Sequence, residues 1–180
     1  MGIPRSPSGT MELEQAIRTR RTHKAFAPEP LDRETLDELF ELACWAPNHK
    51  LTNPWRFRVL GPRALERLKE AGGDPVAASK LDRAPTLVAV STTRSGDPVL
   101  DDEDALATAT AAYIVLLSAH GRGLAGYWRT PEVLRTGAGR AALDVPDDER
   151  MLGLLYLGHP RQEPRVPERA PVGDVASYLE

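Results

Sequence analysis

The sequence predicts an α+β fold in which helices dominate, and two observations support this class. Segments with apolar residues at helical spacing alternate with about four short runs of apolar and β-branched residues, so helices and strands are interspersed. No internal repeat or linker divides the 180 residues, a length that buries roughly 70% of the surface of the unfolded chain. We therefore expect a flexible tail at residues 1–10 and one domain over residues 11–180.

The first half of the chain predicts three helices and a strand. Residues 11–21 carry apolar residues at helical spacing, and a second helix is expected from Leu31, capped by Asp32 and ended by Pro47. Residues 55–59 alternate aromatic or aliphatic side chains with arginines, as in a half-buried strand. A short helix is expected to begin at Pro62 and to stop at the "GGDP" break.

The second half predicts three strands around a long helix. Residues 86–92, 124–128 and 152–158 are short apolar runs typical of buried strands, with short helical pieces expected at 131–134 and 139–143. Residues 101–120 begin with acidic residues, which the helix dipole favours, and continue apolar on every side. Such a helix belongs in a core or in a subunit interface. Pro160 and the three prolines that follow it predict that the end of the chain, about residues 161–180, is an extended arm.

Composition excludes several classes of function. The net charge of −3 gives no basic field for nucleic acid or anionic membranes, and no run of about 18 apolar residues could span a membrane. The single cysteine, Cys44, cannot form an internal disulfide, which indicates a cytoplasmic protein. Cys44 falls on the inner side of the second helix, so we expect it in the core.

The stretch "RTRRTHKAF" at residues 18–26 is a candidate phosphate site. If the first helix ends near Arg21, then Arg20, Arg21, Thr22 and Lys24 leave its last turn together. Arginine donates to phosphate in a bidentate fork, and lysine adds a point charge. The alternative is that these cations only favour the carboxyl end of a helix.

The stretch "APNHKLTNPWRF" at residues 46–57 is a polar loop between two prolines. No second histidine or carboxylate lies at ligand spacing from His49, so we expect no metal site. Beside Trp45 and Trp55, the loop could line a flat aromatic ligand. It could equally be a connector from helix to strand with buried tryptophans.

The stretch "GYWRTP" places Trp128, Arg129 and Thr130 at the end of a strand, where ligands often bind in α/β sheets, and Arg161 follows the next strand. The glycines of "GRG" at 121–123 follow a helix, so they are no dinucleotide fingerprint. No catalytic acid, base or nucleophile is evident. The chain therefore either only binds a ligand or lets a cofactor supply the chemistry.

Together these stretches resemble the FMN-dependent nitroreductase family, and more closely its short bacterial NAD(P)H nitroreductase branch, the YdjA-like subgroup. The likeness covers about residues 11–165 and is carried by "RTRRTHKAF", "APNHKLTNPWRF", "GYWRTPEVL" and "GLLYLGHP". It implies a three-layer fold, with a central mixed or antiparallel sheet of four to five strands flanked by helices. It also implies a homodimer with exchanged arms and FMN at the interface.

The resemblance also implies roles for individual residues. Arg20, Arg21 and Thr22 would hold the FMN phosphate and ribityl chain, and Lys24 would lie near the pyrimidine edge of the flavin. His49 would reach the flavin of the other subunit. The remaining cofactor contacts would come from Trp128, Arg129, Thr130 and Arg161. More weakly, the resemblance assigns the nicotinamide nucleotide to the end of the long helix, that is, to Ser118, Ala119, His120, Gly121, Arg122 and Gly123.

Three residues depart from the family pattern. Leu51 stands where the wider family has an asparagine, Asn53 replaces a glutamine, and Trp45 stands where close relatives carry an arginine at the subunit boundary. Leu51 and Trp45 could therefore alter what stacks over the flavin and which substrate is accepted.

The implied function is an FMN-dependent NAD(P)H oxidoreductase with a ping-pong mechanism. NADH or NADPH would give a hydride to flavin N5, and a nitroaromatic, quinone or similar small electron-poor acceptor would then take it. Two alternatives stay open: a non-catalytic flavin-binding or flavin-storage dimer, and a family member with other flavin chemistry.

Overall fold

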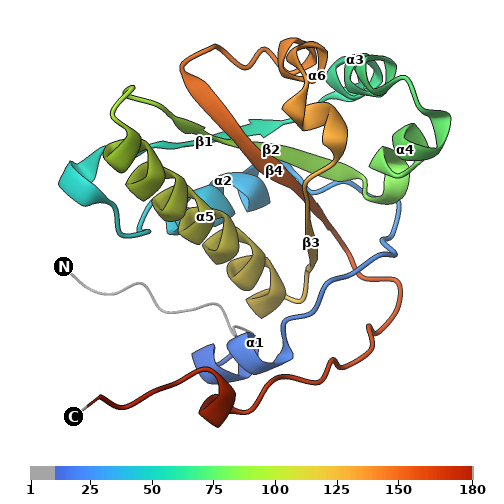
Figure 1. The fold of residues 1–180 in the computed structure, drawn as a ribbon. Helices are drawn as coiled ribbons and strands as arrows, with labels where there is room; N and C mark the ends of the chain where they lie inside the picture. The colour runs from blue at the N-terminus through green and yellow to red at the C-terminus, as the bar shows by residue number, and fades with distance from the viewer. Residues whose placement is uncertain (1–10, 180) are drawn as a thin grey trace.

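The fold is built on a four-stranded antiparallel sheet with the strand order β1-β2-β4-β3 (Figure 1). The computed structural model describes residues 11–179, so the tail predicted at residues 1–10 lies outside the described part. The elements in chain order are α1 (Leu13–Thr19), α2 (Arg33–Ala43), η1 (His49–Leu51), β1 (Trp55–Val59), α3 (Pro62–Gly72), α4 (Pro75–Ser79), η2 (Leu81–Arg83), β2 (Thr86–Thr93), α5 (Pro98–Gly121), β3 (Ala125–Arg129), η3 (Glu132–Arg135), α6 (Gly137–Ala142), β4 (Glu149–Gly158) and η4 (Val172–Asp174). The predicted α+β class with interspersed helices is confirmed.

Helices cover both faces of the sheet and give three layers (Figure 1). On one face, α2 and α5 pack on the sheet through a core that includes Leu39, Val88 and Val115. On the other face, α3, α6 and the short helices η2 and η3 enclose a second core that includes Leu68 and Tyr156. Because both faces of the sheet are covered, the sequences of the central strands β2 and β4 are nearly continuous runs of apolar residues.

The edges of the sheet are β1 and β3. β3 pairs with β4 from Ala125, opposite Gly158, to Arg129, opposite Leu154. β4 begins at Glu149, so its first residues extend beyond the end of β3 and have a strand neighbour, β2, on one side only. This part of β4 therefore has an open edge on the side of β3.

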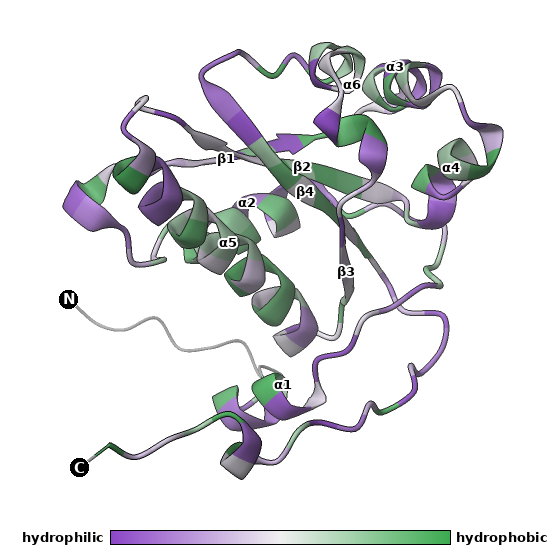
Figure 2. Cartoon of the chain, viewed as in Figure 1, coloured by the Kyte–Doolittle hydropathy of each residue, from purple (hydrophilic) through white to green (hydrophobic). Residues whose placement is uncertain are grey.

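The long helix α5 is buried on one side and exposed on the other. Small residues such as Ala111 and Ala112 lie fully buried against the sheet and α2, while Leu106 is 71% exposed and Tyr113 is 39% exposed. Figure 2 shows hydrophobic residues along much of α5. The sequence predicted a helix that is apolar on every side. In the structure, one apolar face of α5 is buried in the core and a second apolar face is exposed. None of the helices in residues 11–179 is long and apolar enough to cross a membrane.

Two expectations about helix ends and one about burial were wrong. α1 ends at Thr19 rather than near Arg21, and α2 ends at Ala43, so that Pro47 lies beyond it. Cys44 is therefore the residue after the helix and is exposed rather than in the core. Cys44 keeps helical φ and ψ, and at 3.6 residues per turn it lies about 80° around the helix from the buried Leu36, at the margin of the buried face.

The helix α4 was not predicted. Gly73 ends α3 in the left-handed conformation with φ of 66°, and Asp74 then caps a new helix by accepting a hydrogen bond from the Val76 amide at 2.9 Å. The "GGDP" stretch therefore both ends α3 and begins α4. After β4 the chain contains only η4, and residues 161–171 have neither helix nor strand.

Candidate functional site

The segment after α1 lies along the outer edge of β3 (Figure 1). Thr22 forms a parallel bridge with Gly126, and the amide of His23 donates a hydrogen bond to the Gly126 carbonyl at 3.1 Å. The extended backbone of Thr22 and His23 thus occupies only the first part of this edge. The remainder of β3, toward Arg129, has no strand beside it within the described residues.

The start of the C-terminal arm lies against the same segment. Phe26 bridges to Pro160, and the amide of Arg161 donates to the Ala25 carbonyl at 3.3 Å. Backbone hydrogen bonds thereby gather cations from distant parts of the sequence. We call the group formed by residues 20–24, 126–130 and 161 the edge strip; the predicted site residues in it are Arg20, Arg21, Thr22, Lys24, Trp128, Arg129, Thr130 and Arg161.

The two neighbouring arginines of the strip have different environments. The guanidinium of Arg20 lies over the ring of Tyr113 on α5, 5.8 Å from its centroid. Arg21 donates from Nη1 to the carbonyls of Arg18 and Arg20 at 2.7 and 2.9 Å, while its buried Nε has no partner among the described residues. Arg21 thus caps the carboxyl end of α1, and Thr22 and Lys24 are exposed beside it.

Trp128 and Arg129 point to opposite faces of the sheet, as neighbouring strand residues must. Trp128 packs against the α5 core, and its indole N–H donates to the Leu152 carbonyl at 3.3 Å. Arg129 donates to the Tyr156 hydroxyl and to the Lys80 carbonyl at 3.3 and 3.4 Å. Burial raises the pKa of Tyr156, and the Arg129 guanidinium opposes that rise. The structure therefore does not bring the Arg129 side chain to the Trp128 side of the strand.

The backbone of β3 offers hydrogen-bonding groups at the edge. In an antiparallel ladder, successive residues direct their amide and carbonyl groups alternately toward the partner strand and away from it. The Gly126 carbonyl faces away from β4, because it accepts from His23. The amide and carbonyl of Trp128, two residues later, therefore also face outward, and no residue in 11–179 bonds to them.

Gly153 on β4 makes room for the Trp128 ring. It lies at the register shift between β2 and β4 and has φ of +155°, which strongly favours glycine. A Cβ there would lie 2.3 Å from Trp128 Nε1 and 2.7 Å from the Arg129 carbonyl oxygen. The position of the Trp128 indole thus depends on a glycine in the neighbouring strand.

Two histidines lie at the α1 end of the strip. His23 is buried, and its Nδ1 has no partner among the described residues. His120 Nε2 lies 2.8 Å from Thr19 Oγ1. Burial lowers the pKa of both histidines, and the nearby charge of Arg20 adds to the lowering. The sequence analysis did not single out His23; only its place between Thr22 and Lys24 in an extended segment could have indicated that it faces inward.

The loop over residues 45–53 is exposed and has an unusual backbone. Trp45 is 83% exposed and Leu51 is 77% exposed, and His49 is exposed as well. Lys50, Leu51 and Asn53 all have positive φ, between 48° and 53°. Non-glycine residues rarely adopt this conformation, and each instance costs roughly 1–3 kcal/mol. Of the two expected tryptophans, Trp55 is buried and Trp45 is not.

Side-chain hydrogen bonds hold this loop on the first half of α5. The side-chain Oδ1 of Asn48 accepts from the backbone amide of Asn53 at 3.0 Å, and the Thr52 hydroxyl donates to the buried carboxylate of Asp104 at 2.6 Å. His120, beside the edge strip, is sixteen residues further along the helix, or about 24 Å. Within one chain, the structure does not bring Trp45, His49 or Leu51 to the strip (Figure 1).

The end of α5, residues 118–123, lies beside α1 and hence near the strip. Arg122 forms an ion pair with Glu38 of α2, and Gly123 ends the helix with φ of 75°. Ala119 is fully buried. Among the predicted nucleotide residues, the Arg122 side chain is therefore already engaged and that of Ala119 is inaccessible from this surface.

The strip has the chemistry to bind a planar group that carries a phosphate. Cationic side chains and a hydroxyl gather at its α1 end, while outward backbone groups and an indole lie along β3. Within residues 11–179, no cluster of three His, Cys, Asp or Glu side chains could hold a metal ion.

The chain is similar in sequence to proteins of one known family. A model of the nitroreductase family matches residues 17–159. YfhC of Bacillus subtilis (strain 168), named as an NAD(P)H nitroreductase, is 25% identical over 177 residues, which cover 90% of this chain and 91% of that protein. YdjA of Escherichia coli (strain K12), named likewise, is 26% identical over 162 residues, with coverage of 83% and 88%.

A solved structure supports the same fold. The crystal structure of the FMN- and NADPH-dependent nitroreductase NfnB from Sphigopyxis sp. strain HMH matches with a TM-score of 0.80 at 19% identity, covering 94% of this chain and all of that one. The three-layer architecture expected from the sequence is therefore confirmed, with a sheet of four antiparallel strands.

Proposed function

Because the chain belongs to the nitroreductase family, we propose that it is an FMN-dependent oxidoreductase that uses NADH or NADPH. The proposal rests chiefly on the edge strip, where phosphate-binding side chains and an open strand edge lie side by side. The relatives named for NAD(P)H and the structural neighbour named for FMN and NADPH support the same assignment.

The residues of the strip fit FMN in this structure. Arg20 and Arg161 offer cations and Thr22 offers a hydroxyl for the phosphate and ribityl chain, at the end of β3 nearest to α1. The outward amide and carbonyl of Trp128 can bond to the polar edge of a flavin ring. An orphaned Arg21 Nε at the same end is a further donor that lacks a partner within residues 11–179.

When bound, FMN would supply the redox chemistry by accepting a hydride from the nicotinamide and passing it to an electron-poor acceptor such as a nitroaromatic or a quinone, in a ping-pong sequence. The contribution of this chain is binding and orientation. Lys24 would supply positive charge for the pyrimidine edge, where negative charge develops during the reaction. Trp128, whose indole is held by the Leu152 carbonyl and by the space at Gly153, would keep the outward amide and carbonyl of β3 in position for the ring. The proposal does not require the Arg129 side chain to touch the ring, since it lies on the opposite face.

We propose that the functional unit is a homodimer and that the loop over residues 45–53 completes the site of the partner. The loop exposes Trp45 and Leu51, and α5 exposes Leu106 and Tyr113. Exposed apolar side chains such as these are typical of an interface. The loop is too far from the strip of its own chain to act there, which is expected if His49 serves the second subunit. The lone thiol, Cys44, suits the reducing cytoplasm, where we place the protein.

An absorbance spectrum of the purified protein, followed by anaerobic titration with NADH and NADPH, tests the function. We expect bound FMN that is bleached by at least one nucleotide, and steady-state NAD(P)H oxidation with a nitroaromatic or quinone. Bleaching without turnover would indicate a storage protein instead. A preparation that stays colourless after addition of FMN would contradict the proposal altogether.

Replacement of Arg20 tests its assigned role. Arg20→Ala should weaken FMN binding by about 1.5–3 kcal/mol, or roughly 10- to 150-fold, because a charge-assisted hydrogen bond is lost. Arg18→Ala is the matched control, since Arg18 is exposed and makes only a 4.0 Å contact with Glu14 on its own helix. Equal FMN affinities of the two variants in equilibrium titration would refute the assignment.

A further inference from the structure

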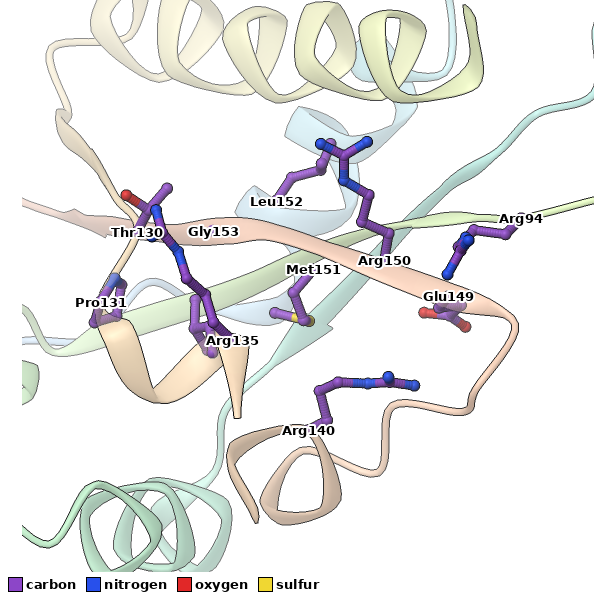
Figure 3. A pocket seen from close by; sticks show the side chains of 11 residues that line it. Arg94, Thr130, Pro131, Arg135, Arg140, Glu149, Arg150, Met151, Leu152 and Gly153 are labelled. Carbon is purple, nitrogen blue, oxygen red and sulfur yellow. The ribbon is translucent and has the colours of Figure 1, made fainter. Parts of the chain in front are cut away.

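A cavity lies beyond the end of β3 and shares only Thr130 with the edge strip (Figure 3). Its volume is about 490 Å³, within the range of roughly 300–1,000 Å³ usual for ligand sites. The floor is the first part of β4, which extends past β3, and η3 and α6 form the walls. Thr130 and Pro131, where the chain leaves β3, line its entrance.

Arginine dominates the polar lining of this cavity, which we call the arginine pocket. Its four arginines come from four different elements or loops: Arg94, Arg135, Arg140 and Arg150. Figure 3 shows Arg94 and Arg140 turned toward the region of Glu149, and Arg135 rising from η3 toward Thr130. The only acidic side chain of the lining is that of Glu149.

Glu149 does not neutralise the charge of these arginines, because its carboxylate oxygens already accept hydrogen bonds from Arg58 and Ser91, which do not line the pocket. Arg58 donates to both of its oxygens at 2.7 and 2.9 Å, and the Ser91 hydroxyl donates at 2.5 Å. Burial on its own would raise the pKa of Glu149, but the bonds from Arg58 and Ser91 outweigh it and leave the pKa lowered. Glu149 and Arg58 thus form a neutral pair in the wall.

The pocket arginines themselves are weakly engaged. Arg94 and Arg150 contact Asp101 and Asp102 at 3.5 and 3.8 Å, and such partly exposed pairs contribute little, about 0–1 kcal/mol. Arg140 donates from Nη2 to the Pro146 carbonyl at 2.7 Å and to the exposed Asp147 at 3.1 Å, whereas its buried Nε has no partner within the described chain.

Arg135 has no acidic partner within 4 Å among residues 11–179. Arg135 without such a partner, the unsatisfied buried Nε of Arg140 and the loosely held Arg94 match an oxyanion, which guanidinium groups bind in bidentate fashion. Arg150 lines the hollow from the α5 side of β4 (Figure 3).

The position of the pocket separates it from the cofactor phosphate cluster. The cations of the strip surround Thr22, which bridges to Gly126, whereas the pocket opens at Thr130. Four strand residues, or about 13 Å, lie between these two points. A ligand that reacts at the middle of β3 could therefore extend an anionic group into the pocket while the cofactor phosphate occupies the other end.

We propose that the arginine pocket binds an oxyanion group of the molecule that exchanges electrons at the edge strip, a proposal that rests on the function proposed above. The oxyanion has two sources: a phosphate of NADH or NADPH, or the carboxylate of an acidic acceptor. Both present the same chemistry to the arginines.

The test uses Arg135→Gln, because Arg135 is exposed and without an ion pair, so its replacement should not disturb folding. Arg63→Gln, an exposed arginine of α3 remote from the pocket, is the matched control. First, inorganic pyrophosphate is titrated into protein saturated with FMN and followed by calorimetry. We expect the apparent affinity to fall at least about threefold in Arg135→Gln and to be unchanged in Arg63→Gln.

Steady-state kinetics then identify the source. A KM increase of about threefold to tenfold for NADH or NADPH, with a neutral acceptor unaffected, assigns the pocket to the dinucleotide. The same increase for 4-nitrobenzoate but not for nitrobenzene assigns it to an acidic acceptor. If pyrophosphate affinity and every KM equal those of the Arg63→Gln control, the pocket proposal is overturned. Pyrophosphate binding is read without turnover, so failure of the proposed function and failure of the pocket are distinguishable.

Discussion

The edge strip and the loop over residues 45–53 lie at opposite ends of α5 and are held by different forces. In the strip, main-chain bonds fix Thr22, His23 and Arg161 to neighbouring backbone. In the loop, left-handed residues are held by side-chain bonds, above all from Thr52 to Asp104. The strip is thus complete within one chain, whereas the loop presents exposed apolar side chains on a strained backbone. Strain and exposure together indicate that the loop is shaped for a second molecule.

The largest expected effect comes from disturbing the strip through Gly153. Gly153→Ala should lower the free energy of unfolding by roughly 3 kcal/mol or more, since it adds a clash with Trp128 to an unfavourable backbone conformation. FMN affinity should fall as well, because the indole can no longer keep its place. Denaturant unfolding and FMN titration measure the two effects.

Gly137→Ala is the control for this change, because no heavy atom lies within 4 Å of a Cβ at that position. It should be neutral or stabilise by up to about 1 kcal/mol. If Gly153→Ala and Gly137→Ala have the same free energy of unfolding and the same FMN affinity, the close contacts around Gly153 do not constrain the strip.

An intermediate effect is expected in the loop. Thr52→Val keeps the shape of the side chain but leaves the buried Asp104 carboxylate without its donor, which should cost about 1–3 kcal/mol. Urea unfolding checks the stability, and dimer dissociation and FMN affinity check the consequence for the partner site. Thr110→Val, an exposed threonine of α5 whose hydroxyl bonds to the Leu106 carbonyl, should leave the stability in urea unchanged. A Thr52→Val protein as stable as that control would show that the loop holds its conformation without Asp104.

The smallest effect concerns pH. Burial lowers the folded-state pKa of His23 and His120 below the ordinary value of 6.5, so the unfolded chain binds protons first as the pH falls. Stability should therefore be full above about pH 6.5 and decline below it, through the lowered folded-state pKa values. His23→Gln should flatten this decline, while His159→Gln, an exposed control, should not. Equal slopes in urea unfolding between pH 5 and 7 would contradict the assignment to His23.

The sequence predicted most of the fold, because alternation and helical spacing are local properties. Residues 55–59 and 86–92 became strands β1 and β2, and Asp32 caps α2 as expected. The ends of helices were harder to predict, since the end of α2 at Ala43 and the start of α4 after Asp74 depend on local capping geometry.

The candidate site was only partly predictable. Arg20, Thr22 and Arg161 form a cluster because β3 and the arm meet the same segment, and the family pattern anticipated this. The opposite directions of Trp128 and Arg129 follow from strand alternation, but which face each residue takes depends on the register. The arginine pocket draws on residues from 94 to 150 without any periodicity, so only the folded chain brings them together.

The open edge of β3 has a further consequence. A row of unpaired amide and carbonyl groups is a template for strands from other molecules, and proteins usually cover or shorten such edges. Here β3 is five residues long and its first part is covered by Thr22, so only a few positions stay open. A ligand that bonds to these positions would also shield the chain from edge-to-edge association. Loss of the cofactor would then be expected to shorten the lifetime of the dispersed protein as well as to abolish its chemistry.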